Sequence, residues 1–313
     1  MNKYAGWALV AYWIALVGMA AYFVFSANNI GASVTATRYA FVLTASSRGE
    51  KDANTDPIDK SNFWLNEVRV YSALREAGFE AKNIRVLYAD GKPAFDETME
   101  TLNVARIKKE QFSGKYDNMA TIENIQAELA RFAGLVKPDD IFVMYLGTHG
   151  APSFVEIQVG DLDMLVSDLQ KMLEKVRPSF GLFYSDACHS GAFIAQLNLS
   201  NYILVSTTGQ HTYGWGDRYF SGGAYFFQSL IDGESDVDVD GKITVEEALF
   251  RSQERANAHM QRIDQYLRNK YNFNQGVGGY DELMKPGGTS SVVQNMIVEA
   301  GASADYSLYN SFR

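Results

Sequence analysis

The chain has 313 residues, of which 47% are hydrophobic and 21% are charged. This composition is typical of a folded globular protein with a core large enough for independent folding, and it excludes a disordered chain. The formal net charge of -9 at pH 7 argues against nucleic acid as a partner, because phosphate binding needs basic patches. A cationic peptide is a better electrostatic match. The single cysteine excludes an intramolecular disulfide.

An uncharged apolar segment covers residues 4–25. Its roughly 22 residues are enough to cross a bilayer as a helix, whereas the apolar region of a cleaved signal peptide is normally about 7–15 residues long. We therefore expect residues 1–30 to form a membrane anchor and linker, followed by one domain over residues 31–313. Lys3 precedes the segment, so the positive-inside rule favours an extracytoplasmic domain. A signal peptide, the alternative, also exports the domain.

Two kinds of element alternate along the rest of the chain. Apolar runs rich in β-branched and aromatic residues predict buried strands, and apolar residues at helical spacing predict amphipathic helices. The expected strands cover residues 39–44, 84–88, 141–146, 180–184 and 202–206, and the expected helices cover residues 63–77, 122–135 and 162–176. This alternation indicates an α/β fold with a mostly parallel sheet between two layers of helices. Residues 90–117 are polar, and we expect them to form a loop at one wall of a cleft.

The only cysteine follows one of these strands. Residues 180–184 lead into SDACHSG, which contains Cys188, and the strand over residues 141–146 leads into GTHG, which contains His149. In open parallel sheets, reactive groups lie at the carboxyl ends of the strands. We therefore expect the Cys188 thiol and the His149 imidazole at one edge of the sheet, as a dyad for nucleophilic catalysis. A buried, unreactive cysteine is the alternative.

Such a dyad attacks an amide carbonyl. The thiol reacts as a thiolate, for which His149 would act as the base before it protonates the leaving amine. The backbone N–H groups of Gly150 and Cys188 would stabilise the oxyanion of the tetrahedral intermediate. His189 is a rival base, although neighbouring side chains in a strand-end turn diverge. A zinc site is disfavoured by the single cysteine and scattered histidines, and a serine hydrolase by the lack of a G-x-S-x-G elbow.

These motifs resemble those of the caspase-like cysteine peptidases. THG after one strand and DACHSG after the next are similar to active-site motifs of the legumain and glycosylphosphatidylinositol (GPI) transamidase family and of the metacaspases. NFWLN at residues 62–66, the helix that follows it and the strand over residues 84–88 also resemble the legumain side of this group. The resemblance covers about residues 38–260. It implies a caspase-like three-layer α/β/α sandwich with His149, rather than His189, as the base.

The resemblance also implies a substrate pocket beside the cysteine. In these families, an acidic residue at the position of Asp186 helps to form the pocket for the side chain that precedes the cleaved bond. A lone carboxylate there favours Arg or Lys, whereas pairing of Asp186 with a cation such as Arg48 favours Asn. The alternative is an aspartate that caps a turn. The third catalytic residue of legumain-like enzymes, an asparagine after the first strand, is replaced here by SSR at residues 46–48.

A second motif lies in the C-terminal half of the chain. Residues 236–247 read DVDVDGKITVEE and match the calcium loop of an EF-hand at each diagnostic position. The expected ligands are Asp236, Asp238, Asp240, the Lys242 carbonyl, Thr244 through water, and both carboxylate oxygens of Glu247. Gly241 would permit the sharp turn, and helices over residues 224–231 and 245–263 would flank the loop. The alternative is an acidic turn that caps the second helix.

Together these features predict a membrane-anchored cysteine endopeptidase that cleaves peptides or proteins after a basic residue, with calcium and without an organic cofactor. Three alternatives stay open. A transpeptidase or transamidase of the same fold shares the dyad and resolves the acyl-enzyme with an amine in place of water. An inactive relative would keep the fold as a calcium-dependent binding module. A membrane scaffold in a larger complex is compatible with catalysis.

Overall fold

The computed structural model describes residues 36–46, 59–89, 117–157, 162–210, 221–271 and 297–300, with backbone alone for residues 59–62, 65, 260–271 and 297–300. The chain divides into two units, Met1–Ala36 and Thr37–Arg313, and all but one of the described residues belong to the second. The expected anchor over residues 4–25 and the polar segment over residues 90–116 lie outside the described ranges. Among the described helices, none is both long and apolar enough to cross a membrane.

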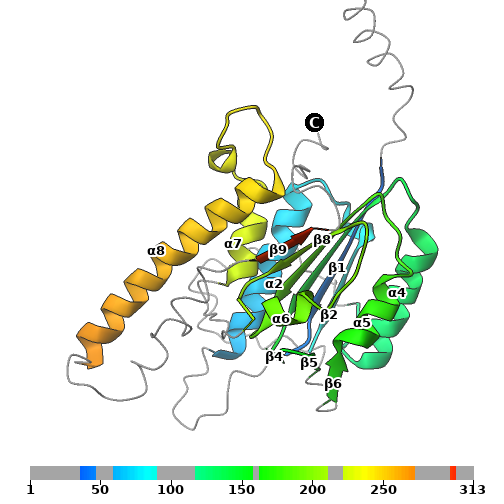
Figure 1. The fold of residues 1–313 in the computed structure, drawn as a ribbon, viewed down its shortest axis with the longest axis horizontal. Coiled ribbons are helices and arrows are strands. Elements are labelled where there is room, and N and C mark those ends of the chain that lie inside the picture. The colour runs from blue at the N-terminus through cyan, green and yellow to red at the C-terminus, as the bar shows by residue number, and fades with distance from the viewer. Residues whose placement is uncertain are drawn as a thin grey trace, which may run out of the picture. The chain divides into compact units, whose positions relative to one another are not determined.

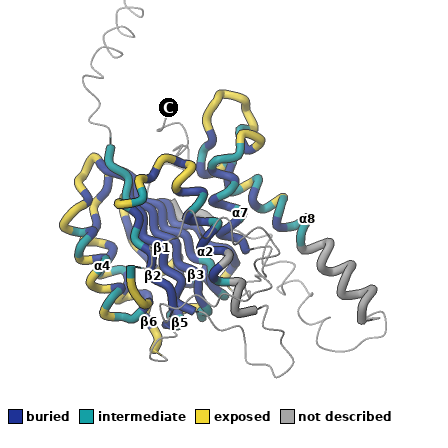
Figure 2. The backbone as a smooth tube through the Cα atoms, turned by 180° about the vertical axis from the view of Figure 1, so that it is seen from behind, coloured by how far each residue is buried: buried dark blue, intermediate teal, exposed yellow. Residues whose placement is uncertain are grey.

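A six-stranded sheet forms the centre of the second unit, with the strand order β2-β1-β3-β7-β8-β9 (Figure 1). The strands are β1 (Arg38–Thr44), β2 (Ile84–Tyr88), β3 (Ile141–Gly147), β7 (Phe180–Asp186), β8 (Tyr202–Ser206) and β9 (Ile297–Ala300). The first five strands in this order run parallel, and β9 pairs antiparallel with β8. Every residue of β3 and β8 is buried, as expected for parallel strands covered on both faces (Figure 2).

One face of the sheet carries an extended apolar core. Three helices pack on it, namely α4 (Ile122–Leu135), α5 (Val166–Leu173) and α6 (Ser190–Ile194). Ile125 of α4, Leu169 of α5 and Phe193 of α6 join Phe142 and Phe183 from the sheet in this core. Thr121 caps the start of α4, because its side chain accepts a hydrogen bond from the N–H of Asn124 at 3.1 Å.

The opposite face is covered by α2 (Asp59–Glu76) and α7 (Gly222–Ser229), and α8 (Val245–Tyr271) packs against α7 (Figure 1). Single-turn helices η1 (Ala81–Asn83) and η3 (Gly233–Ser235) precede β2 and the acidic loop. Helices therefore lie on both faces of a mostly parallel sheet. The predicted α/β architecture is confirmed, and the arrangement fits a caspase-like fold.

The prediction of a helix over residues 162–176 is wrong in its first turn. β6 (Leu162–Leu165) is a strand, and α5 begins only after it. β6 pairs antiparallel with β5 (Phe154–Ile157), which pairs with β4 (Gly150–Ala151) in a separate three-stranded sheet. The ladder satisfies the backbone of this segment and leaves only Met164 of β6 buried. Apolar spacing within one segment does not reveal a pairing partner elsewhere in the chain.

Candidate active site

His149 and Cys188 follow neighbouring strands that end at the same level. The last residues of β3 and β7, Gly147 and Asp186, are paired in the parallel ladder. His149 and Cys188 each come two residues after this pair. The N–H of Thr148 donates to the Asp186 carbonyl at 3.3 Å and extends the contact beyond the ladder. Both candidate residues therefore lie at the carboxyl edge of the sheet, and both are partly exposed.

The two segments also meet through their backbones. A Cβ atom added to Gly150 would lie 3.1 Å from the Cβ of Ala187 and 3.2 Å from the carbonyl oxygen of Cys188. A side chain at this position would crowd both atoms, so glycine permits the close approach. The residue after His149 is thus packed directly against the segment that carries Cys188.

Hydrogen bonds to the end of β8 fix the turn after Cys188. The N–H and the hydroxyl of Ser190 each lie 2.9 Å from Thr208 Oγ1, and the N–H of Thr208 donates to Ser190 Oγ at 3.2 Å. His189, between Cys188 and Ser190, has φ 56° and ψ 19°, which is the left-handed region of backbone conformation. Its Nδ1 lies 3.3 Å from the Gln210 carbonyl, which can only accept, so Nδ1 carries the proton. His189 therefore has a bonding partner on the far side of the turn from β3.

An aromatic residue of α2 packs against the imidazole of His149. The rings of Phe63 and His149 meet edge to face, with centroids 5.3 Å apart and planes at 77°. This contact restricts the orientation of the imidazole. Ser46 at the end of β1 is buried, whereas Arg48 lies outside the described residues.

Hydrogen bonds from other parts of the chain fix the position of the Asp186 carboxylate. Its Oδ2 accepts hydrogen bonds from the Tyr145 hydroxyl and from the N–H of Gly223, both at 3.1 Å. Gly223 is the second residue of α7, so the carboxylate lies at the helix N-terminus, where the helix dipole favours an anion. Burial raises the pKa of Asp186, and hydrogen bonds from Ser221, Thr207, Tyr145 and Gly223 counteract part of the rise. Asp186 thus acts as a cap of α7 while remaining partly exposed.

Helix α2 carries a buried acid that no sequence pattern predicted. Glu67 has 0% exposure, and neither of its carboxylate oxygens has a hydrogen-bond partner among the described residues. Burial raises the pKa of Glu67 well above its ordinary value, and the nearby Thr44 hydroxyl lowers it only in part. Glu67 also contributes to the raised pKa of Tyr145, so the two groups lie near each other. The sequence contains one signal for this buried acid: Glu67 stands between Trp64 and Val68, two apolar residues that the structure buries.

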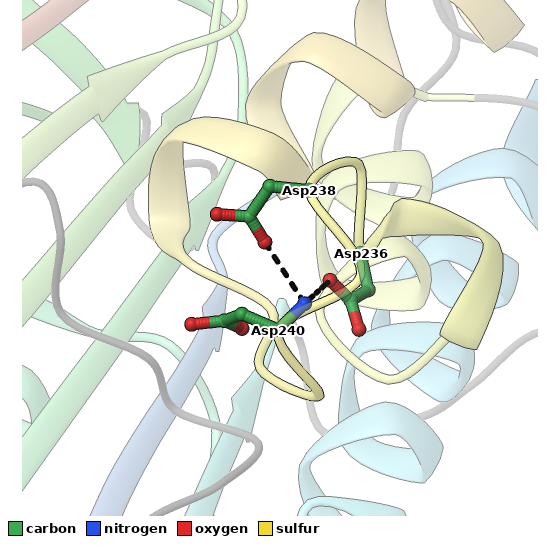
Figure 3. A group of neighbouring side chains, drawn as sticks. All are labelled: Asp236, Asp238 and Asp240. Carbon is green, nitrogen blue, oxygen red and sulfur yellow. Dashed lines mark hydrogen bonds between the residues drawn. The ribbon is translucent and has the colours of Figure 1, made fainter.

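The acidic loop over residues 236–247 brings three aspartates together. One oxygen each from Asp236, Asp238 and Asp240 lies within 4.8 Å of the others. Figure 3 shows Asp236 and Asp238 turned toward the backbone N–H of Asp240, which donates to both at 3.1 Å. Gly241 has φ 84°, the left-handed conformation that the expected turn requires.

Glu247 is not part of this group of three in the structure. Its carboxylate accepts hydrogen bonds from the N–H groups of Val237 and Thr244, both at 2.9 Å. Thr244 Oγ1 accepts in return from the N–H of Glu247 at 3.1 Å, an arrangement that caps the start of α8. Burial tends to raise the pKa of Glu247, but the hydrogen bonds from Thr244, Val237 and Asp238 bring it below its ordinary value. The neighbouring Lys242 donates its N–H to Asp240 at 2.7 Å.

A family model places the chain among known proteins. The model of the Peptidase C13 family matches residues 62–236, more than half of the chain, including His149 and Cys188. The chain belongs to the Peptidase C13 family. Legumain and the GPI transamidase are of this family, so a cysteine peptidase or transamidase activity on a protein or peptide substrate is supported. Among curated proteins, none matches the chain significantly. The likeness to metacaspases stays a resemblance of two short motifs.

The buried acid of α2 generates a prediction for stability. Because burial raises the pKa of Glu67 in the folded state, folding takes up a proton. Its contribution is most favourable below the unfolded pKa of about 4.3 and becomes less favourable as the pH rises toward the folded pKa. We expect Glu67→Gln to lose less unfolding free energy than the unmodified protein between about pH 4 and pH 8 in urea titrations. Glu76→Gln, at an exposed position of the same helix, is the control, and parallel curves for all three proteins would refute the prediction.

Proposed function

We propose that this member of the C13 family is a cysteine endopeptidase with Cys188 as nucleophile and His149 as general base. The observation that carries the proposal is the register of β3 and β7, which ends both strands at the Gly147–Asp186 pair. The close contact of Gly150 with the Cys188 carbonyl supports it. Partial exposure of both side chains gives a substrate access to them.

The proposed reaction has two stages. His149 takes the thiol proton, the Cys188 thiolate attacks the carbonyl carbon, and His149 then protonates the leaving amine. In the second stage, His149 takes a proton from water, which attacks the thioester and releases the acid. The backbone N–H groups of Gly150 and Cys188 are the proposed donors to the oxyanion in both stages.

Transamidation is the competing outcome of the same acyl-enzyme, and membership of the family favours it equally. An amine then replaces water in the second stage. Adding hydroxylamine to a cleavage assay separates the two reactions. A hydroxamate product that forms in preference to the acid assigns transamidation, whereas acid as the main product assigns hydrolysis.

We further propose a preference for Arg or Lys before the cleaved bond. Asp186 lies two residues before the nucleophile, remains partly exposed, and belongs to a chain with a net charge of -9. The donors at the start of α7 favour its ionised form, which a cationic side chain would complement. The pairing of Asp186 with Arg48 that would favour Asn involves a residue outside the described ranges.

The location and the metal remain proposals as well. We propose that residues 4–25 anchor the full chain in a membrane with the catalytic domain outside the cytoplasm, on the basis of their length and lack of charge. Retention of the full chain in the membrane fraction after alkaline extraction tests this anchor.

We also propose that the loop over residues 236–247 binds Ca²⁺. The proposal is supported by the three aspartates whose carboxylate oxygens lie close together in the loop.

Substitution of the dyad should abolish turnover without unfolding the protein. Cys188→Ala removes the nucleophile and His149→Asn removes the base, and we expect each to lower kcat by about 10³-fold or more in a peptide cleavage assay. His189→Asn is the matched control, because asparagine tolerates the left-handed backbone at this position. It should lower kcat far less than His149→Asn. Activity retained in Cys188→Ala or His149→Asn would refute the proposed dyad. A larger loss of kcat in His189→Asn than in His149→Asn would assign the role of base to His189.

Asp186→Asn should weaken the preference for basic residues more than it weakens cleavage overall. A peptide library cleaved by the unmodified protein should favour Arg or Lys before the scissile bond. We expect the preference over neutral residues to fall by about tenfold in Asp186→Asn, because one charge pair is lost. Asp163→Asn, at an exposed position of β6, should leave the preference unchanged. A preference for Asn or Asp that Asp186→Asn does not alter would contradict the proposal.

Calcium should stabilise the fold through the acidic loop. The carboxylates of Asp236, Asp238 and Asp240 lie close together, and a bound cation would offset their repulsion. With a dissociation constant of about 10⁻⁴–10⁻³ M, 10 mM Ca²⁺ would contribute about 1–3 kcal/mol and raise the melting temperature by several degrees. Glu247→Gln should remove most of the rise, and Glu246→Gln, its exposed neighbour, should not. If Ca²⁺ does not raise the melting temperature of the unmodified protein, the proposed calcium site is refuted and the loop is only an acidic cap of α8.

A further inference from the structure

We propose that Tyr145 is a positioning residue, whose hydroxyl holds Asp186 and thereby sets the distance between the segments that carry Cys188 and His149. The inference rests on the proposed dyad and adds a residue that neither touches the substrate nor takes part in proton transfer. It follows from the way in which the end of β7 is bonded to β3.

Asp186 makes two hydrogen bonds to the chain around Gly147. One partner, Tyr145, lies within β3, and the other, Thr148, is the residue that follows β3. The Asp186 carbonyl accepts from the N–H of Thr148 at 3.3 Å, and its carboxylate accepts from the hydroxyl of Tyr145 at 3.1 Å. Thr148 directly precedes His149, and Asp186 lies two residues before Cys188. The last residue of the nucleophile strand is therefore tied twice to the segment that carries the base. The Tyr145 bond is the one of these two that a side-chain substitution can remove.

Helix α7 closes over this bond. A Cβ atom added to Gly223 would lie 2.5 Å from Tyr145 Cε2 and 2.7 Å from Asp186 Oδ2, so the start of α7 packs against both partners. Tyr145 is only 2% exposed, and water has little access to replace its hydroxyl. Burial, together with the charge of Asp186, raises the pKa of Tyr145 well above its ordinary value. The hydroxyl therefore remains a donor over the pH range in which peptidases work.

The chain offers a matched tyrosine for comparison. Tyr184 stacks on Tyr145 with ring centroids 6.3 Å apart, comes from the paired position of β7 and is equally buried. Its hydroxyl bonds to Thr207 Oγ1 at 3.1 Å, beyond the end of β8 and away from β3, so it reaches Asp186 only indirectly, through the Thr207 side chain. Removing either hydroxyl takes one oxygen from the same buried layer. Only the Tyr145 hydroxyl bonds Asp186 to the strand before His149.

The experiment compares Tyr145→Phe with Tyr184→Phe in the full chain. We expect Tyr145→Phe to lower kcat by about tenfold or more with KM within about twofold, because small displacements of reacting groups cost large factors in rate. Alkylation of Cys188 by iodoacetamide should slow in the same proportion. Tyr184→Phe should keep kcat and the alkylation rate within about twofold, with a similar change in melting temperature.

A double-mutant cycle tests the route through Asp186. If Tyr145 acts through Asp186, adding Tyr145→Phe to Asp186→Ala, which leaves no acceptor for the hydroxyl, should lower kcat much less than Tyr145→Phe does alone. Additive effects, equal losses in the two Phe variants, an unchanged kcat in Tyr145→Phe, or a rise in KM alone would each overturn the inference. Failure of the unmodified protein both to cleave peptides and to be alkylated at Cys188 would instead refute the proposed function.

Discussion

The parallel pairing of β3 with β7 is the constraint on which the candidate site depends. Side chains on a strand alternate between two faces, so a slip of one residue in this ladder would turn every side chain of one strand to the wrong side. The alternation fixes the register: Met144 and Phe183 enter the apolar core under α4, α5 and α6, and Tyr145 and Tyr184 face α7. With the register fixed, both strands end together, which places the segments that carry His149 and Cys188 next to each other.

The two faces of the sheet differ in chemistry near this edge. The α4 side is apolar, whereas the α7 side buries Glu67 and Tyr145 and holds the partly exposed Asp186 next to Tyr145. Buried polar groups cost stability unless they are bonded. Asp186 accepts two hydrogen bonds, whereas the carboxylate of Glu67 lacks a partner of normal hydrogen-bond geometry among the described residues. Perturbed acids of this kind concentrate at functional sites, which supports the same edge as the site on grounds independent of the cysteine.

Sequence patterns predicted the elements whose signal lies within one segment. β2, α4 and β8 have the expected bounds because the apolar pattern of a strand or of an amphipathic helix covers the whole of each element and turn residues flank it. β6 and β9 were missed because each is defined by a partner: β6 by β5, and β9 by β8 across a long stretch of sequence. The same reason explains the site. The positions of His149 and Cys188 follow from strand order, whereas the capping of α7 by Asp186 depends on Gly223, 37 residues further along the chain, which no local pattern contains.

Helix α7 joins the two motifs that the sequence presents separately. Its first turn donates the N–H of Gly223 to Asp186, and its last residue, Ser229, bonds to Arg255 of α8. Arg255 also pairs with Asp232, and Arg251 pairs with Glu234, so α8 is tied to the segment between α7 and the acidic loop. The acidic loop is therefore closed at both ends by elements in contact with α7. Any change in the loop that displaced α7 along its axis would act on the hydrogen bond to Asp186, because the glycine pair at its start leaves no side chain between the helix and the end of β7.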